Sequence, residues 1–259
     1  MADSALYTAA VAVYDFENNA NATKGSNLTA TGSPAYSTTG EAQGTYWAGQ
    51  LDGGDYFSIT SNTFNFTGSY SVSAWVSFDN LPYYGPICSF YYQSNGSGWA
   101  VTQDADYSLR VRHRQNWSDT NYDFTGANFT TSTRYHIVIS HNATTNECWA
   151  YVSTTSFGNI LNTHIDAATD PGNDAAGGTL YIARDDVDDS NLQGYIDEVC
   201  FWNSAITSTD AEAIFNARDG GTSWRETGEA SSTPTLKRRL NILLRLCLST
   251  FNLIWRCFK

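Results

Sequence analysis

Residues 193–202, Gln-Gly-Tyr-Ile-Asp-Glu-Val-Cys-Phe-Trp, give the clearest indication of the fold. In an extended strand successive side chains point to opposite faces, so the odd-numbered residues share one face and the even-numbered residues the other. Both faces carry large apolar side chains, which predicts a strand covered on both sides, as in a two-layer sandwich. Asp197 and Glu198 lie in its middle, and a buried carboxylate needs a hydrogen-bond partner, a counter-charge or a metal ion.

A short helix is predicted directly after this strand. Ser208 or Thr209 can cap its first turn, with Glu212 reaching back to the cap. The spacing of three further residues gives the helix one apolar side, formed by Ala211, Ile214 and Phe215.

The run from Gly194 through the start of this helix resembles the closing signature of laminin-G-like, concanavalin A-like jelly-roll domains. Three earlier stretches resemble the same family, in the family's order: Val-Ala-Val-Tyr-Asp-Phe-Glu-Asn-Asn-Ala-Asn at 11–21, Gln-Leu-Asp-Gly-Gly-Asp-Tyr-Phe-Ser-Ile at 50–59 and Phe-Thr-Gly-Ser-Tyr-Ser-Val-Ser-Ala-Trp-Val at 66–76. The resemblance covers about residues 6 to 217. It implies an all-β fold, an antiparallel two-sheet jelly-roll sandwich. It says little about function, because such folds carry unrelated activities.

Alternation along the chain predicts about a dozen to fourteen strands. The clearest strand is 70–78, with five apolar side chains on one face, and the first strand is expected at 6–16. Residues 107–114 place Arg110, Arg112 and Arg114 on one face of another strand. The polar segments 17–45 and 154–178 are expected to be long loops.

The C-terminal part differs from this domain. We expect the jelly-roll domain at 1–218, a Gly-, Ser-, Thr- and Pro-rich linker at 219–235 and a basic amphipathic helix at 236–259. One polar stripe follows the helical period along that segment, and most other positions are apolar. The helix would lie on a membrane surface, dock into other subunits of a larger assembly, or be a non-native extension. Its expected anchoring residues are Arg238, Arg245, Trp255 and Arg256.

Charge, cysteine content and the N-terminal sequence limit the possible partners and locations of the protein. Residues 1–227 contain 8 Lys/Arg and 25 Asp/Glu, a balance of −17, which disfavours nucleic acid as a partner. Cys88, Cys148 and Cys200 fall in strand-like stretches, where a free cysteine behaves as a small buried hydrophobe. The N-terminus lacks the pattern of a secretory signal. The missing signal pattern, together with the anchoring helix expected at 236–259, favours an extracellular or virion-surface location.

A Ca²⁺ site is a further expectation from the family resemblance. Carried over to this chain, it places the ion between Glu17, Asn19 and Asp197. The alternative is that Asp197 accepts backbone hydrogen bonds from the first loop. The acidic run 185–189 is either a second calcium loop or a solvated one.

Sugar binding is the favoured function, because pyranose rings stack on exposed aromatic side chains. The arginine row runs into Trp117, and together they could hold an anionic glycan. The expected glycan-binding residues are Trp99, Arg112, Arg114, Trp117 and Tyr122. The alternatives are that these aromatics belong to the core and that the arginines neutralise the acidic domain or meet a neighbouring subunit.

Catalysis is not expected, because adjacent acids on a strand point to opposite faces and no same-face acid pair is present. The chain is therefore predicted to be a non-catalytic module for glycan binding or surface display within a larger assembly. A purely structural assembly protein and a polysaccharide hydrolase or lyase are the alternatives.

Overall fold

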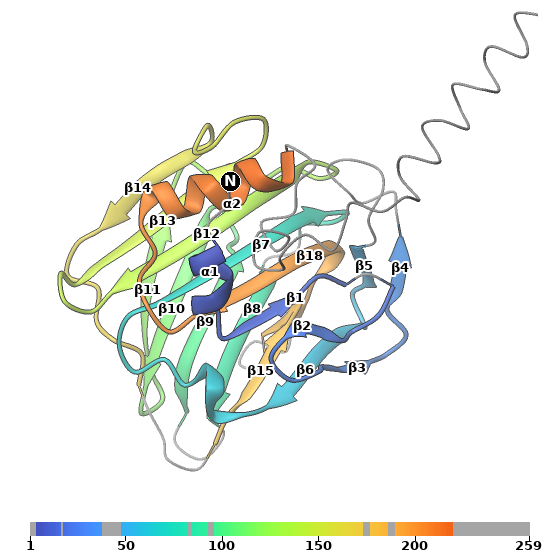
Figure 1. Ribbon diagram of the computed structural model, residues 1–259, viewed down its shortest axis with the longest axis horizontal. Coiled ribbons are helices and arrows are strands. Elements are labelled where there is room, and N and C mark those ends of the chain that lie inside the picture. The colour runs from blue at the N-terminus through green and yellow to red at the C-terminus, as the bar shows by residue number, and fades with distance from the viewer. Residues whose placement is uncertain are drawn as a thin grey trace, which may run out of the picture.

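The computed structural model describes residues 4–16, 18–37, 48–81, 84–92, 96–172, 177–185 and 190–219. Two antiparallel sheets face each other, as the sequence predicted (Figure 1). The helices are α1 (Ser4–Ala9), α2 (Ser208–Asp219) and the 3-10 turn η1 (Asn62–Phe64). The first nine strands are β1 (Ala12–Tyr14), β2 (Ala22–Lys24), β3 (Thr29–Thr31), β4 (Ala35–Ser37), β5 (Ala48–Asp52), β6 (Tyr56–Thr60), β7 (Tyr70–Phe78), β8 (Gly85–Tyr92) and β9 (Ser97–Gln103). The others are β10 (Leu109–Gln115), β11 (Ser118–Phe124), β12 (Arg134–Asn142), β13 (Glu147–Ser153), β14 (Leu161–Ile165), β15 (Thr179–Ile182), β16 (Arg184–Asp185), β17 (Ser190–Asn191) and β18 (Gln193–Trp202).

Within the part of the chain that the structure describes, one sheet has nine strands and the other seven. The nine-stranded sheet follows the order β14-β13-β12-β7-β18-β1-β2, and β5 joins β18 to β4. The seven-stranded sheet follows the order β11-β10-β9-β8-β15-β6-β3, and β16 and β17 form a separate hairpin. Strand β18 pairs with β7 along one side and with both β5 and β1 along the other, so it lies at the centre of the larger sheet.

The main core fills the space between the sheets. Trp99 lies fully buried there, with Phe66 and Tyr70 stacked against it. Strand β7 contributes the apolar face that its alternation predicted: Tyr70, Val72, Ala74, Val76 and Phe78. Cys88, Cys148 and Cys200 are buried free thiols, as predicted.

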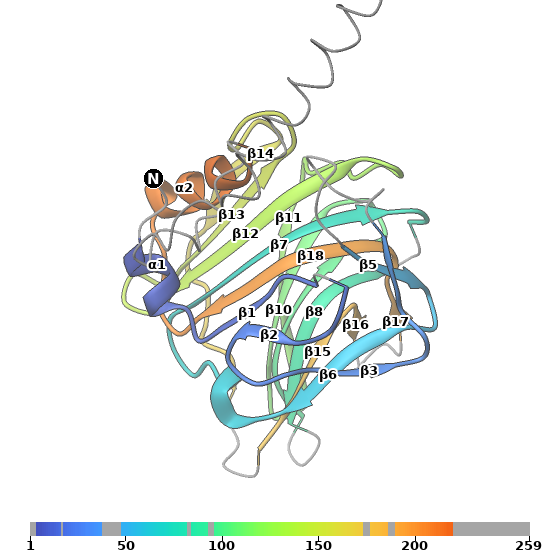
Figure 2. The same ribbon diagram turned by 45° about the vertical axis from the view of Figure 1, so that its right-hand side comes forward.

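A second apolar layer covers the outer face of the nine-stranded sheet. Both α1 and α2 lie on this side (Figures 1 and 2), and their side chains pack with Val138, Tyr151 and Trp202. Helix α2 faces the sheet with Ala211, Ile214 and Phe215, as predicted.

The cap of α2 differs slightly from the prediction. Thr207 and Asp210 form it: the Thr207 N–H donates to Asp210 Oδ2 at 2.9 Å, and the Asp210 N–H donates to Thr207 Oγ1 at 3.2 Å. This is a capping box, with the cap one residue earlier than Ser208 and the reaching acid two residues earlier than Glu212.

Strand β18 has the predicted bounds but not the predicted uninterrupted alternation. The register with β7 shifts between Asp197 and Cys200, and Glu198 has φ 47°. Because this bulge adds one residue, Ile196 and Val199 both face the main core. Asp197 was expected on the same face as Val199. It pairs with Trp75 of β7, and the bulge places it on the opposite face from Val199.

Three other expectations about elements are wrong. Residues 4–9 form α1, so the first strand is much shorter than 6–16. The expected loops 17–45 and 154–178 contain β2, β3 and β4 in the first and β14 in the second. These strands are short or polar and lie toward sheet edges, where backbone hydrogen bonds hold them without an apolar alternation.

The predicted linker and helix at 219–259 lie, from residue 220 on, outside the described residues. Within the described ranges no helix is long and apolar enough to cross a membrane. Attachment through Arg238, Arg245, Trp255 and Arg256 stays a prediction.

His113 gives the core a pH dependence that can be measured. Its Nδ1 contacts the carbonyl of Thr169, which only accepts, so Nδ1 carries the proton and Nε2 accepts the Tyr70 hydroxyl at 2.8 Å. Burial, together with the nearby His141, lowers the pKa of His113 to about 3.

We expect the folded state to lose stability as pH falls from about 6.5 towards 3, because the unfolded chain takes up a proton at His113 that the folded chain refuses. Between pH 7 and pH 5 this one group should cost about 2 kcal/mol. Urea unfolding at both pH values checks it: His113→Gln should reduce the difference by about that amount. An equal pH slope in His113→Gln and the parent would contradict the assignment.

Candidate functional site

The outer face of β10 carries the three arginines that the sequence placed there, and each is paired with aspartate. Arg110 donates from Nε to Asp123 Oδ1 at 2.6 Å and from Nη2 to Asp123 Oδ2 at 3.1 Å, and its Nη2 lies 2.5 Å from Asp104 Oδ2. Arg114 Nε lies 3.0 Å from Asp119 Oδ1. Such pairs neutralise the arginines within the domain, which is one of the alternatives that the sequence left open.

Arg112 forms the most deeply buried of these pairs. Its Nη1 donates to Asp185 Oδ2 at 3.2 Å, and the two side chains are 5% and 0% exposed. Its Nε lies 3.9 Å from Asp119 Oδ2, too far for a hydrogen bond. Asp185, predicted as the start of a solvated or calcium-binding loop, is thus a buried counter-ion for Arg112. Residues 186–189 lie outside the described ranges.

Trp117 is the most exposed large hydrophobic side chain that the structure describes, at 62%. It lies in the turn between β10 and β11, and the Arg114 guanidinium lies over its ring at 5.4 Å. A Cβ built on Gly96 would fall 2.3 Å from the Trp117 ring, so the backbone at Gly96 lies directly against the indole. The ring therefore packs against the Gly96 backbone, and 62% of the residue remains exposed to solvent.

The backbone at Trp117 is in a conformation that costs energy. Asn116 has φ 50° and Trp117 has φ 65°, and the flanking residues Gln115 and Ser118 pair across the hairpin. Two-residue turns of this kind prefer glycine at the second position, and a bulky residue there is an outlier. A strained, exposed tryptophan is an observation that points to function rather than to folding.

The other predicted glycan-binding residues do not share this surface. Trp99 is fully buried and donates its indole N–H to the Phe64 carbonyl at 3.1 Å, so its prediction as a binding residue is wrong. Tyr122 is 6% exposed and packs into the main core, with its hydroxyl on Thr169. Arg112 is buried with Asp185. Arg114 and Trp117 remain together at the surface.

A second aromatic group on the seven-stranded sheet was not found from the sequence. The Arg184 guanidinium lies over the rings of Tyr56 at 4.8 Å and Tyr181 at 5.9 Å. The two tyrosines meet edge to face across β6 and β15 at 5.9 Å. Their positions in different strands, far apart in sequence, left no local pattern to recognise.

The predicted calcium residues are only partly described. Glu17 lies outside the described residues. Asn19 Oδ1 accepts the Asn21 N–H at 2.7 Å, and Asp197 Oδ1 accepts the Glu198 N–H at 2.7 Å. Both residues thus use a side-chain oxygen within their own segments, and calcium binding here stays a prediction.

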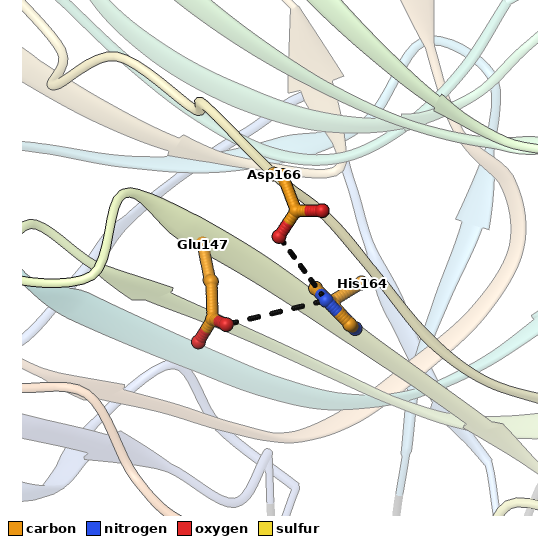
Figure 3. A group of neighbouring side chains, drawn as sticks. All are labelled: Glu147, His164 and Asp166. Atoms are coloured by element: carbon orange, nitrogen blue, oxygen red, sulfur yellow. Dashed lines mark ion pairs between the residues drawn. The ribbon is translucent and has the colours of Figure 1, made fainter.

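Among the described residues, one group of three acidic or histidine side chains is close enough to hold a metal ion. It consists of Glu147, His164 and Asp166 (Figure 3) and lies on the other sheet. This group was not predicted from the sequence.

Comparison with known proteins supports the fold. A family model described as the concanavalin A-like lectin/glucanases superfamily matches residues 51–212. No curated protein matches the sequence significantly.

Solved structures resemble the chain in fold at low sequence identity. Domain 4 of AbnA, an extracellular arabinanase from Geobacillus stearothermophilus, solved with arabinotriose, superposes with a TM-score of 0.57 at 17% identity, over 79% of this chain and 97% of that one. The botulinum neurotoxin serotype G binding domain gives 0.59 at 12% identity, over 81% of this chain and 51% of that one. The Trypanosoma rangeli sialidase gives 0.52 at 14% identity, over 82% of this chain and 33% of that one.

Proposed function

Because the chain belongs to the concanavalin A-like lectin/glucanases superfamily, we propose that it is a non-catalytic module that binds a neutral glycan, with a sugar ring stacked on Trp117. The observation that carries this proposal is the open indole at the β10–β11 turn, supported by Gly96 and Arg114. Pyranose and furanose rings pack their C–H faces on such flat aromatic surfaces, and nearby polar groups fix their orientation.

The charge arrangement favours a neutral ligand. Arg110, Arg112 and Arg114 are each held by aspartate within 3.2 Å. An anionic sugar would have to compete with those carboxylates, in a chain whose net charge is −12.

Binding is favoured over hydrolysis by the same pairs. A glycosidase needs one carboxyl group that is protonated near neutral pH to act as the general acid. The carboxylates beside the arginine row, Asp104, Asp119, Asp123 and Asp185, each lie within 4.0 Å of an arginine and are engaged in ion pairs within the domain. The display of the domain in a larger assembly, through residues 236–259, remains part of the proposal.

Replacing Trp117 by glycine tests the proposal. The change should leave the domain at least as stable, because glycine is the preferred residue of this turn. Binding to the glycans that the parent domain selects on an array should weaken at least tenfold, about 1.4 kcal/mol, as measured by calorimetry. Raising NaCl from 50 to 500 mM should leave the parent affinity nearly unchanged, because the ligand carries no charge.

Tyr107→Gly is the matched control. Tyr107 is also an exposed aromatic, at 48%, and also has a positive φ of 64°, but it lies at the opposite end of β10. It should keep the parent affinity. Failure of the parent domain to bind any neutral glycan, or equal binding by Trp117→Gly and the parent, would refute the proposal.

A further inference from the structure

We propose that Glu147, His164 and Asp166 form a surface site for a divalent transition-metal ion of the zinc type. The three residues meet at the β13–β14 edge of the nine-stranded sheet, with His164 facing both carboxylates (Figure 3). His164 Nε2 lies 3.2 Å from Asp166 Oδ1 and 4.0 Å from Glu147 Oε1. All three ligand atoms lie within 4.8 Å of one another. The site is independent of the proposed glycan surface, which belongs to the other sheet.

The strand register brings these side chains together. Trp149 pairs with His164 and Cys148 with Ile165, so one further step would set Glu147 opposite Asp166. Alternate residues of β13 share a face: Cys148 enters the main core, and Glu147 and Trp149 point outward. His164 and Asp166 have the same i, i+2 relation. The register of the β13–β14 hairpin therefore places all three ligands on one face of the sheet.

Neighbouring groups hold two of the ligands in place. Glu147 Oε2 accepts the Thr145 hydroxyl at 2.9 Å and the Trp149 indole N–H at 3.3 Å, while Oε1 is the atom nearest to His164. The His164 ring stacks on the Trp149 ring at 4.2 Å. Such support of the ligands by their neighbours raises metal affinity, because less freedom is lost on binding.

A cation relieves a local charge conflict. Two carboxylates placed opposite each other on an antiparallel ladder repel, and the chain as a whole carries −12. The three other histidines of the chain, His113, His136 and His141, are buried, so His164 is the histidine that an ion from solvent reaches.

The ligand set selects the class of ion. One imidazole nitrogen with two carboxylate oxygens suits Zn²⁺ and its neighbours, whereas Ca²⁺ and Mg²⁺ prefer oxygen alone. Tetrahedral Zn²⁺ with bonds near 2.1 Å separates its ligand atoms by about 3.4 Å. The observed 3.2 and 4.0 Å require small side-chain rotations. Three protein ligands leave a fourth position for water.

Calorimetry of the full chain with ZnCl₂, after chelator treatment and dialysis, tests the site. We expect one zinc ion to bind at a site that requires His164. The zinc affinity should be at least tenfold weaker in His164→Gln and in Glu147→Gln. Zinc should also raise the unfolding midpoint of the parent, and both variants should lose this rise. Asp79→Asn, the same loss of charge at an exposed acid elsewhere, should bind zinc like the parent.

Zinc binding that is absent, or unchanged in both His164→Gln and Glu147→Gln, would overturn the proposal. CaCl₂ in place of ZnCl₂ should give no signal that depends on His164. A calcium affinity that His164→Gln weakens as much as the zinc affinity would overturn the assignment to a transition metal. Far-ultraviolet circular dichroism of each variant, matching the parent, keeps these outcomes separate from loss of folding.

Discussion

Asp185→Ala is expected to destabilise the domain by about 3–5 kcal/mol. The substitution takes from the Arg112 guanidinium, whose side chain is 5% exposed, the carboxylate that accepts its Nη1 at 3.2 Å, and Asp119 Oδ2 lies 3.9 Å from Nε, beyond hydrogen-bond distance. A buried charge that loses its counter-charge no longer recovers the cost of its lost hydration through ion pairing. Urea unfolding monitored by tryptophan fluorescence measures the change.

A double replacement distinguishes the effect of losing the Asp185 charge from the effect of losing its side-chain volume. Arg112→Met with Asp185→Leu removes both charges and should recover most of the stability, because apolar residues of similar size substitute for a buried ion pair with little cost. Asp123→Ala is the exposed control: Arg110 keeps Asp104, and the loss should be within about 1 kcal/mol. A loss below about 1 kcal/mol in Asp185→Ala itself would show that water reaches Arg112.

The fold was predictable where one pattern covers a whole element. Strand β7 alternates over its full length, and the even-numbered residues from Tyr70 to Phe78 form the core face as expected. The apolar spacing of α2 likewise matched its contacts. In both elements burial depends on local periodicity, which the sequence displays directly.

The bulge in β18 was not predictable in this way. Two apolar faces on one strand look the same whether or not a residue is inserted between them. Only the shifted register with β7 and the positive φ of Glu198 show that the faces exchange at this point. The bulge moves Asp197 to the other face of the sheet, so its environment depends on pairing between distant segments.

Only part of the candidate glycan site was predictable, because local sequence did not show which aromatic side chains are buried. Trp99 and Trp117 both follow a run of polar residues in the sequence, but one is inside the sandwich and the other is at a turn. The Asn-Trp pair between two alternating strands could have indicated the turn. The pairing of Arg112 with Asp185 joins β10 to β16 and leaves no trace in local sequence.

The metal group was missed because its second strand was assigned to a loop. His164 and Asp166 have the i, i+2 spacing of same-face ligands, which becomes visible once 161–165 is known to be a strand. The strand is short and mostly polar, and it lies at the sheet edge. Its partner Glu147 comes from β13, so the group depends on the hairpin register.

Gly194→Ala is expected to destabilise the domain by about 4 kcal/mol or more, through backbone strain and overpacking together. Gly194, the second residue of β18, has φ 147°, and a Cβ there would fall 2.0 Å from the Ser77 carbonyl oxygen and 3.0 Å from the Phe78 Cα. Both atoms belong to the backbone of β7, so they cannot move aside without breaking the ladder between β7 and β18. Thermal and urea unfolding of the purified variant measure the loss.

Gly68→Ala is the control for the unfolded chain, because it removes the same backbone freedom. A Cβ at Gly68 would meet nothing closer than the Ala143 Cβ at 3.9 Å, so this variant should be neutral or gain up to about 1 kcal/mol. If Gly194→Ala were as stable as Gly68→Ala, the close pairing of β18 with β7 at this residue would be wrong. A large loss confined to Gly194→Ala would instead mean that the strand at the centre of the larger sheet requires glycine for its approach to β7, which its alternation of apolar residues does not reveal.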